Sequence, residues 1–99
     1  MSLTLSAAAE RDIISAIGWY DSQKVGLGSL FVEAVAGKLA EIEEHPLHYP
    51  QFSPNSRRHF RFSMVRRFPY RIICEIKTSD TIVVLAVAHT SRKPDYWQH

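Results

Sequence analysis

Two stretches in the first half of the chain place apolar residues every three or four positions, which is the spacing of one helix face. The first stretch follows Ser6, a suitable N-cap, and predicts a helix over residues 7–23. The second predicts a helix over residues 27–44, which ends before Pro46 because proline disfavours the helical conformation of the residue that precedes it. The two apolar stripes consist of Ala9, Ile13, Ile17 and Tyr20, and of Leu27, Leu30, Phe31, Ala34, Val35, Leu39 and Ile42.

The remaining apolar positions predict four strands, because they alternate with polar positions or form short apolar runs. Leu3 and Leu5 alternate with polar residues ahead of the first helix. The other three runs follow a loop that contains three prolines, and the last run is almost wholly apolar, so we expect it inside the sheet. The loop covers residues 46–56, the runs cover residues 58–65, 70–77 and 82–89, and residues 78–81 join the last two as a hairpin.

The order β-α-α-β-β-β predicts an α+β fold in which a helical hairpin packs on one face of an antiparallel sheet. The first strand can pair with a later strand at the edge or in the centre of that sheet. No predicted element is left to cover the other face. The 99 residues suffice for one small domain over residues 1–99, whose core is marginal at this size, so a homodimer or a stabilising partner fits the chain.

The net charge of +2 conceals an asymmetry between the two halves of the chain. Residues 1–50 carry three basic and seven acidic side chains, a net charge of −4, and residues 51–99 carry nine basic and three acidic ones, a net charge of +6. Six of the eight arginines lie in or between the later strands, so we expect them to make the uncovered sheet face attractive to a polyanion or an acidic partner. These six are Arg57, Arg58, Arg61, Arg66, Arg67 and Arg71.

The chain lacks the marks of secreted, membrane-bound and metal-binding proteins. Cys74 is the single cysteine and can form no internal disulfide, which fits a reducing compartment. We find no secretory signal, and the longest apolar run, residues 82–88, is far shorter than the roughly 20 residues of a membrane-spanning helix. His45 and His48 flank Pro46 and have no cysteine partner, so we expect no metal and no other cofactor. These features predict a cytoplasmic protein without membrane contact.

Six short segments combine with a characteristic spacing. They read Trp19-Tyr20, Gly26-Leu27-Gly28 with Phe31, Tyr49-Pro50, Arg66-Arg67-Phe68-Pro69-Tyr70, Val84-Leu85-Ala86-Val87-Ala88-His89 and Arg92-Lys93-Pro94-Asp95-Tyr96-Trp97. In these segments the chain resembles the RelE/ParE superfamily, the toxin halves of type II toxin–antitoxin modules, which are often called plasmid stabilization proteins. The resemblance covers nearly the whole chain and is most specific over residues 66–97.

The resemblance implies a function as well as the same α+β fold. RelE-like members enter the ribosomal A site and cut mRNA, whereas ParE-like members inhibit DNA gyrase, and an antitoxin silences both by wrapping the toxin with an extended or helical segment. We expect an mRNA interferase, a metal-independent endoribonuclease that acts on the ribosome and is neutralised by a cognate antitoxin. The alternatives are a gyrase inhibitor without nuclease activity and a decayed toxin that only binds its antitoxin and co-represses the operon. A homodimer and a toxin–antitoxin hetero-oligomer are both open.

RNA cleavage by this class uses the adjacent ribose 2′-OH as the nucleophile, so the protein must remove one proton, supply another and stabilise charge on the phosphate. By its place after residues 68–70, Arg71 resembles the family's arginine that faces the scissile phosphate, and Arg92 resembles the one just past the last strand. Tyr96 resembles the tyrosine that transfers a proton or stacks on a base. His89 is a candidate general acid or base, because histidine side chains titrate near neutrality.

A second group of residues is expected to hold the RNA backbone. The best-defined nuclease pattern has lysines on the strand that follows the proline-containing loop, where this chain has arginines and a histidine. A base at this place would therefore have to be His59. The group consists of Arg57, Arg58, His59, Arg61 and Arg67.

Structural roles compete with these functional ones. Arg71 can pair with Glu75 on the same face of its strand, and His89 can bond to the backbone at the strand end. The arginine cluster can instead be the docking surface for an acidic antitoxin segment. Packing is expected for Trp19 and Tyr20 in the helical hairpin and, as an alternative to stacking on a base, for Tyr96 and Trp97.

Overall fold

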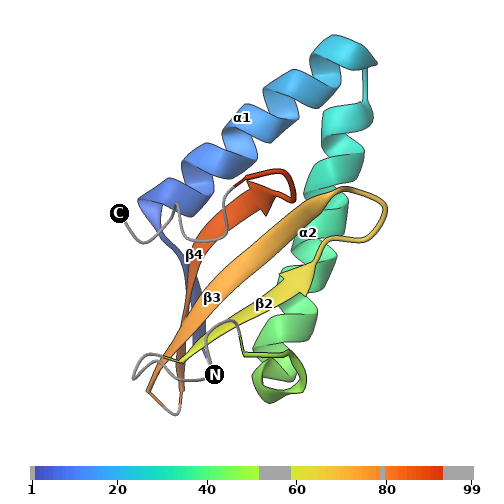
Figure 1. Ribbon diagram of the computed structural model, residues 1–99. Coiled ribbons are helices and arrows are strands. Elements are labelled where there is room, and N and C mark those ends of the chain that lie inside the picture. Colours follow the sequence, from blue (N-terminus) through green and yellow to red (C-terminus); the bar gives the residue numbers. More distant parts are fainter. Residues whose placement is uncertain (1, 52–58, 79, 93–99) are drawn as a thin grey trace.

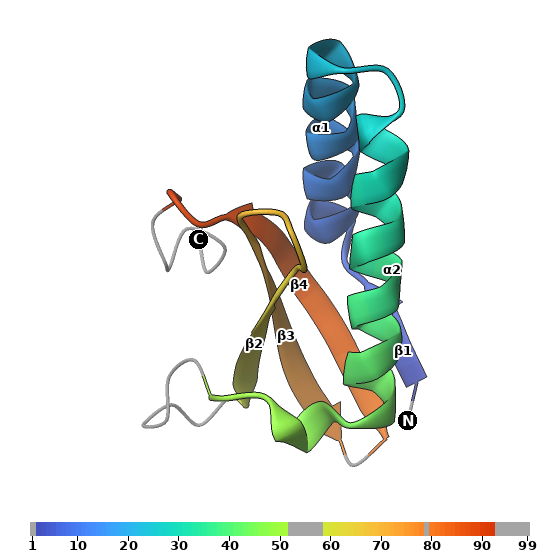
Figure 2. The same ribbon diagram turned by 90° about the vertical axis from the view of Figure 1, so that its right-hand side faces the viewer.

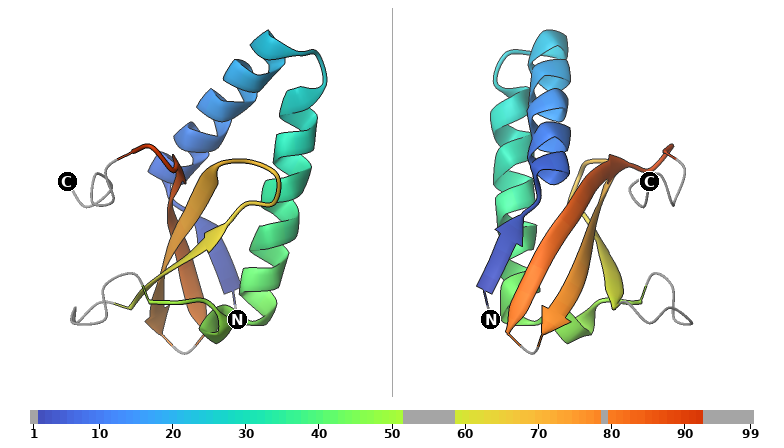
Figure 3. Two further views of the ribbon diagram at one scale, coloured as in Figure 1. Left: turned by 45° about the vertical axis from the view of Figure 1, so that its right-hand side comes forward. Right: turned by 90° about the vertical axis from the view of Figure 1, so that its left-hand side faces the viewer.

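Two helices lie along one side of a four-stranded sheet in the computed structural model, which describes residues 2–51, 59–78 and 80–92 (Figures 1 and 2). The helical hairpin extends past the sheet at the end where the two helices are joined (Figure 3). The elements in chain order are β1 (Ser2–Leu5), α1 (Ala7–Gln23), α2 (Leu27–Glu44), a 3-10 helix η1 (Pro46–His48), β2 (Phe60–Met64), β3 (Tyr70–Thr78) and β4 (Thr81–His89).

The N-terminus of α1 is fixed by the predicted cap. The Ser6 hydroxyl oxygen accepts a hydrogen bond from the Ala9 amide at 3.0 Å, which satisfies one of the free donors of the first turn. The same hydroxyl donates to the carbonyl oxygen of Leu85 at 3.2 Å, and the Ser6 amide donates to that of Val84 at 2.9 Å. The cap therefore also ties the start of α1 to β4.

The turn between the helices depends on two glycines. Gly26 has a φ of 91°, which residues with a Cβ rarely adopt, and it supplies no side chain to cap α2. Asp21 on α1 takes over this role, because its carboxylate accepts a hydrogen bond from the amide of Gly28 at 2.8 Å. A Cβ on Gly28 would lie 2.8 Å from three atoms of the Asp21 carboxyl group, so this hydrogen-bonded position of the carboxylate leaves no space for a side chain at residue 28. Glycine thus suits position 26 because of its backbone conformation and position 28 because of the contact with Asp21.

The sheet has the order β1-β4-β3-β2, so β4 lies inside it, as its apolar sequence predicts. β3 is antiparallel to both β2 and β4, but β1 at the edge runs parallel to β4, and the predicted antiparallel sheet is therefore mixed. The reason is the direction of the chain. α1 continues the direction of β1, and α2 returns to the end at which β1 begins (Figure 2). β2 starts at this end of the sheet, and β3 runs back to it. β4 therefore starts at the same end as β1 and runs parallel to it.

The core lies between the helices and the two long strands. Phe31 of α2 is fully buried and meets the rings of Phe68 and Tyr70 nearly edge-on, with centroids 5.2 and 5.0 Å apart. Tyr20 of α1 contacts the same three rings at 5.0–6.1 Å. Edge-to-face contacts are favourable because the positive edge of one ring meets the negative face of another. This aromatic cluster holds the helical hairpin on β3.

The two faces of the sheet carry different residues. Along β3, Ile72 and Cys74 belong to the core on the helix side, so Arg71 and Ile73 face the other side, which we call the open face. The register pairs Ile73 with Phe62 of β2, which places that ring on the open face as well. Across the described part of the chain, no helix is both long and apolar enough to cross a membrane.

Candidate functional site

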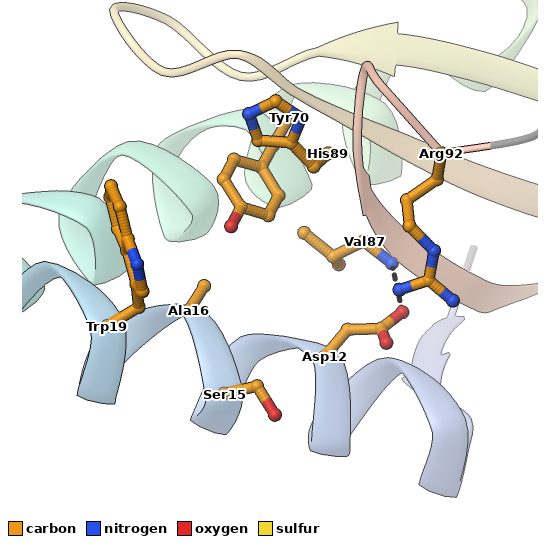
Figure 4. Close-up of a pocket in the computed structure, with 8 residues that line it drawn as sticks. All are labelled: Asp12, Ser15, Ala16, Trp19, Tyr70, Val87, His89 and Arg92. Atoms are coloured by element: carbon orange, nitrogen blue, oxygen red, sulfur yellow. Dashed lines mark hydrogen bonds between the residues drawn. The ribbon is translucent and has the colours of Figure 1, made fainter.

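Two adjoining hollows of about 310 and 390 Å³ lie between α1 and the C-terminal end of β4, and we call them together the α1–β4 cleft. Figure 4 shows the residues that line the first of them. The two hollows share Trp19, Tyr70 and His89. The lining thus includes two of the predicted catalytic residues, His89 and Arg92. The remaining lining residues are Asp12, Ser15, Ala16, Tyr20, Pro69 and Val87.

His89 stands at the end of β4 with a defined tautomer. Its Nδ1 accepts a hydrogen bond from the Ser91 amide at 3.0 Å and lies 2.8 Å from the Ser91 hydroxyl. A ring nitrogen that accepts from an amide carries no proton, so the neutral ring has its N–H at Nε2. The ring meets Tyr70 edge-on at 5.3 Å. His89 therefore makes the backbone hydrogen bond that was expected as its structural role, and its ring also lines the cleft.

Asp12 closes the cleft where β1 no longer covers β4. The pairing of β1 ends at Val84, and beyond it the Asp12 Oδ2 accepts a hydrogen bond from the Val87 amide at 2.9 Å (Figure 4). An unpaired amide at this edge would cost free energy on burial, so α1 here replaces a strand. The side chain of Arg92 points toward the Asp12 carboxylate (Figure 4). Sequence reasoning missed Asp12, because no motif marks a carboxylate that meets an amide 75 residues away.

Burial and charge alter the phenols beside the cleft. Burial raises the pKa of Tyr70 above its usual value of 10.0, and the negative charge of Asp12 raises it further. Burial also raises the pKa of Tyr20, with a smaller contribution from Tyr70. Both phenols are therefore neutral hydrogen-bonding groups at physiological pH.

Arg71 lies away from the cleft. It pairs with Ala88 across β3 and β4, whereas the neighbouring Tyr70 pairs with His89. Because successive residues of a strand face opposite sides, Arg71 and His89 leave the sheet in opposite directions. The Arg71 guanidinium lies over the ring of Phe62, 5.2 Å from its centroid, on the open face. The structure thus brings His89 and Arg92 together and separates Arg71 from them.

Arg61 and Arg66, among the arginines that the structure describes, do not lie on the open face as expected. Arg61 projects to the helix side, where its guanidinium donates to the carbonyl oxygen of Tyr49 at 2.6 Å, and Arg66 reaches Glu41 of α2 at 3.2 Å. The positive charge is dispersed because Arg61 occupies a position of β2 that faces the helices, and Arg66, after the end of β2, is paired with α2. The Arg67 backbone has a left-handed φ of 68°. His59 is exposed just before β2, and Arg57, Arg58 and Tyr96 lie outside the described residues.

Two competing structural roles can be compared with the contacts. Glu75, the expected partner of Arg71, forms an ion pair with Lys77 at 3.5 Å. Trp19 packs as expected against Tyr20, with the two rings nearly edge-on and their centroids 5.0 Å apart, but it is 58% exposed, whereas Tyr20 is 8% exposed. Trp19 is exposed because it directly precedes Tyr20, and adjacent positions of a helix point in different directions, so its side chain lies off the apolar stripe of α1.

A second concave surface lies between the helical hairpin and the turn that joins β2 to β3. This groove of about 660 Å³ is mostly apolar, and Leu30 in it is 55% exposed. Arg66 and Arg67 stand at one side of it, and Glu33 stands on α2. The other lining residues are Tyr20, Leu27, Ala34, Phe68 and Pro69. We call this surface the α2 groove. Among the described residues, no cluster of three or more histidines, cysteines and carboxylates could hold a metal ion.

Comparisons with known proteins agree with this architecture. The model of a family described as "ParE toxin of type II toxin-antitoxin system, parDE" matches residues 3–94. The solved structure titled "Chromosomal ParDE TA system from P. aeruginosa" is similar in fold, with a TM-score of 0.77 at 15% sequence identity, over 90% of this chain and 95% of that one. No curated protein sequence matches the chain significantly.

Proposed function

Because this chain belongs to the ParE toxin family of type II toxin–antitoxin systems, we propose that it arrests growth by binding DNA gyrase rather than by cutting mRNA. A cognate antitoxin is the partner that such a toxin implies. Gyrase is the target of ParE-like members of the superfamily, and it would place the toxin in the cytoplasm. The proposal departs from the mRNA cleavage expected from the sequence.

The separation of the candidate catalytic residues carries the proposal. Cleavage of one phosphodiester needs proton transfer and charge stabilisation around a single phosphate, with each group within hydrogen-bonding reach. Arg71 faces the open side of the sheet, whereas His89 and Arg92 line the cleft against α1. A scissile phosphate held by Arg71 would therefore be out of reach of His89. A toxin that acts by occupying a protein target needs no such convergence.

The α2 groove is the surface that we propose for the antitoxin. It offers exposed apolar area at Leu30, and Arg66 and Arg67 add positive charge at one side. An amphipathic segment with apolar residues facing the groove and acidic residues facing the two arginines would be complementary to it. Within the described part of the chain, the arginines that line the groove are the two of the β2–β3 turn, and Arg71 lies on the open face instead.

Two assays on the purified full-length toxin test the mode of action. We expect it to inhibit the supercoiling of relaxed plasmid by gyrase and to leave a translated mRNA intact in primer extension. Cleavage of that mRNA with unimpaired supercoiling would refute the gyrase proposal and support the nuclease. In that case an Arg71→Ala variant that still cleaves RNA would remove Arg71 from the catalytic site. A chain that causes no growth arrest when induced would be a decayed toxin.

A pair of surface variants tests the antitoxin surface. Leu30→Asp places a carboxylate in the α2 groove, so we expect it to weaken antitoxin binding by at least about tenfold, because a charge buried without a partner is costly. Leu47→Asp is the matched control, since Leu47 on η1 is 67% exposed and does not line the groove. Calorimetric titration with the antitoxin measures both. Equal binding by the two variants would exclude the α2 groove, whatever the toxin's target.

A further inference from the structure

The α1–β4 cleft has aromatic rings on both of its walls. Trp19 projects from α1, and Tyr70 and His89 face it from the sheet (Figure 4). Tryptophan rarely leaves more than half of its surface exposed, yet the exposed fraction of Trp19 is 58%. Exposed aromatic faces at the edge of a hollow are suited to stacking on a planar group.

The polar groups of the cleft are mainly hydrogen-bond donors. His89 has its N–H at Nε2, because Nδ1 accepts from the Ser91 amide. The Tyr70 hydroxyl is directed toward α1, and the guanidinium of Arg92, which points toward the Asp12 carboxylate, has five N–H donors, more than one carboxylate engages (Figure 4). Asp12 is the carboxylate of the lining; its Oδ2 accepts from the Val87 amide, and it faces the Arg92 guanidinium. A ligand rich in acceptors therefore fits the cleft better than a ligand rich in donors.

The charge and size of the cleft further limit the class of ligand that fits it. Arg92 lies at the end nearer the N-terminus of α1, whereas Trp19 lies toward the other end (Figure 4). A planar ring between Trp19 and the sheet would thus have its anionic substituent on the Arg92 side. Guanidinium groups bind phosphate oxygens through paired, charge-assisted hydrogen bonds. The two hollows of about 310 and 390 Å³ fall in the range of pockets for small ligands.

We propose that the α1–β4 cleft binds a nucleotide, with the base stacked on Trp19 and the phosphate held by Arg92. Tyr70 and His89 donate to acceptors on the edge of the base or on the ribose. The nucleotide is a free nucleoside monophosphate or one unit of a single strand, and the chemistry of the cleft is the same for both. This site is separate from the α2 groove, and it does not depend on whether gyrase is the target.

Fluorescence of Trp19 tests the site directly. The chain has two tryptophans, so Trp97→Phe leaves Trp19 as the single emitter. We expect saturable quenching by AMP, because a stacked base quenches indole emission. Calorimetric titration of the unaltered full-length chain repeats the measurement without any substitution. Absence of saturable binding in both experiments at millimolar AMP would overturn the proposal.

Three variants and one ligand change separate the parts of the site. Trp19→Leu should weaken AMP binding by roughly tenfold, the scale of one base-stacking contact. Arg92→Gln should weaken AMP binding by about tenfold or more without changing the affinity for adenosine, which lacks the phosphate. Arg11→Gln is the control: Arg11 is an exposed residue of α1 that does not line the cleft, so the change should alter the affinity for neither AMP nor adenosine. Equal losses with Arg11→Gln and Arg92→Gln would overturn the assignment of the phosphate.

A short single-stranded RNA and its DNA equivalent distinguish the source of the nucleotide. If either binds at least about tenfold more tightly than AMP and remains sensitive to Trp19→Leu, the site takes a strand. If AMP binds as well as the strands do, the site takes the free nucleotide. Quenching by an acidic peptide but not by AMP would refute the nucleotide and identify the cleft as a protein-binding surface. None of these measurements involves gyrase, so their failure is distinct from failure of the proposed function.

Discussion

The contact between Asp21 and Gly28 predicts a specific pattern of stabilities in the helical hairpin. The Asp21 carboxylate accepts a hydrogen bond from the Gly28 amide at 2.8 Å and so replaces the side-chain cap that Gly26 cannot supply. Removal of a helix cap costs about 1 kcal/mol, and the negative charge is also favourable near the positive end of the α2 dipole. We therefore expect Asp21→Ala to lower the free energy of unfolding by about 1 kcal/mol.

Gly28→Ala should remove the same hydrogen bond by another route. The added Cβ would lie 2.8 Å from three carboxyl atoms, so the Asp21 side chain must rotate away and the bond is lost. Alanine favours a helix over glycine by about 0.5–1 kcal/mol, which offsets most of this loss. Gly37→Ala in the same helix is the matched control, because its Cβ meets nothing within 4 Å, and we expect it to stabilise the protein by about 0.5–1 kcal/mol.

The double variant distinguishes the mechanism. Asp21→Ala with Gly28→Ala should be about as stable as Gly28→Ala alone, which gives a coupling of about 1 kcal/mol between the two sites. Urea unfolding followed by circular dichroism measures all four variants, with unchanged m-values as the sign of two-state behaviour. Additive effects within about 0.5 kcal/mol, or a Gly28→Ala variant as stable as Gly37→Ala, would refute the surrogate cap.

Three other measurements test the core and the cleft. Asp12→Ala should cost about 1–3 kcal/mol in urea unfolding, because the Val87 amide loses its acceptor, and an additional loss of backbone protection at Val87 in hydrogen exchange would locate the effect. Phe31→Ala should cost about 3–5 kcal/mol, since a fully buried ring leaves a cavity among its aromatic neighbours; a loss below about 1 kcal/mol would contradict the packing. Because burial and Asp12 raise the pKa of Tyr70 in the folded state, the contribution of Tyr70 to stability should be constant below pH 10 and be lost as the pH rises beyond it, so the alkaline loss of stability should be smaller in Tyr70→Phe; spectrophotometric titration of the phenols gives the matching raised pKa.

Much of the fold could be predicted because its signals are local. The bounds of both helices follow from the spacing of apolar residues, from the Ser6 cap and from Pro46. The apolar run over residues 82–89 indicated an interior strand, and β4 lies between β1 and β3. The parallel pairing of β1 with β4 was missed, because strand direction depends on where the helical hairpin returns the chain.

The candidate site was predicted only in part. His89 and Arg92 do share a cleft, but the prediction did not include Asp12 or Trp19, which lines the cleft in addition to its expected packing against Tyr20. The expectation of an arginine-rich open face failed for Arg61, whose strand position turns its side chain toward the helices. A list of charges along a sequence does not include the face on which each charge lies.

The amino-acid sequence by itself determined which segments are helices and strands, because capping, proline restriction and apolar periodicity act over a few residues. The tertiary structure decided which functional groups meet. Arg71 and His89 belong to neighbouring paired strands, yet a difference of one residue in register sends them to opposite faces. Asp12 and Val87 are far apart in the chain, yet they bond because β1 ends at Leu5 and leaves an edge that α1 must satisfy. Such encounters depend on the packing of whole elements, and the site therefore takes shape only when the sheet and the hairpin come together.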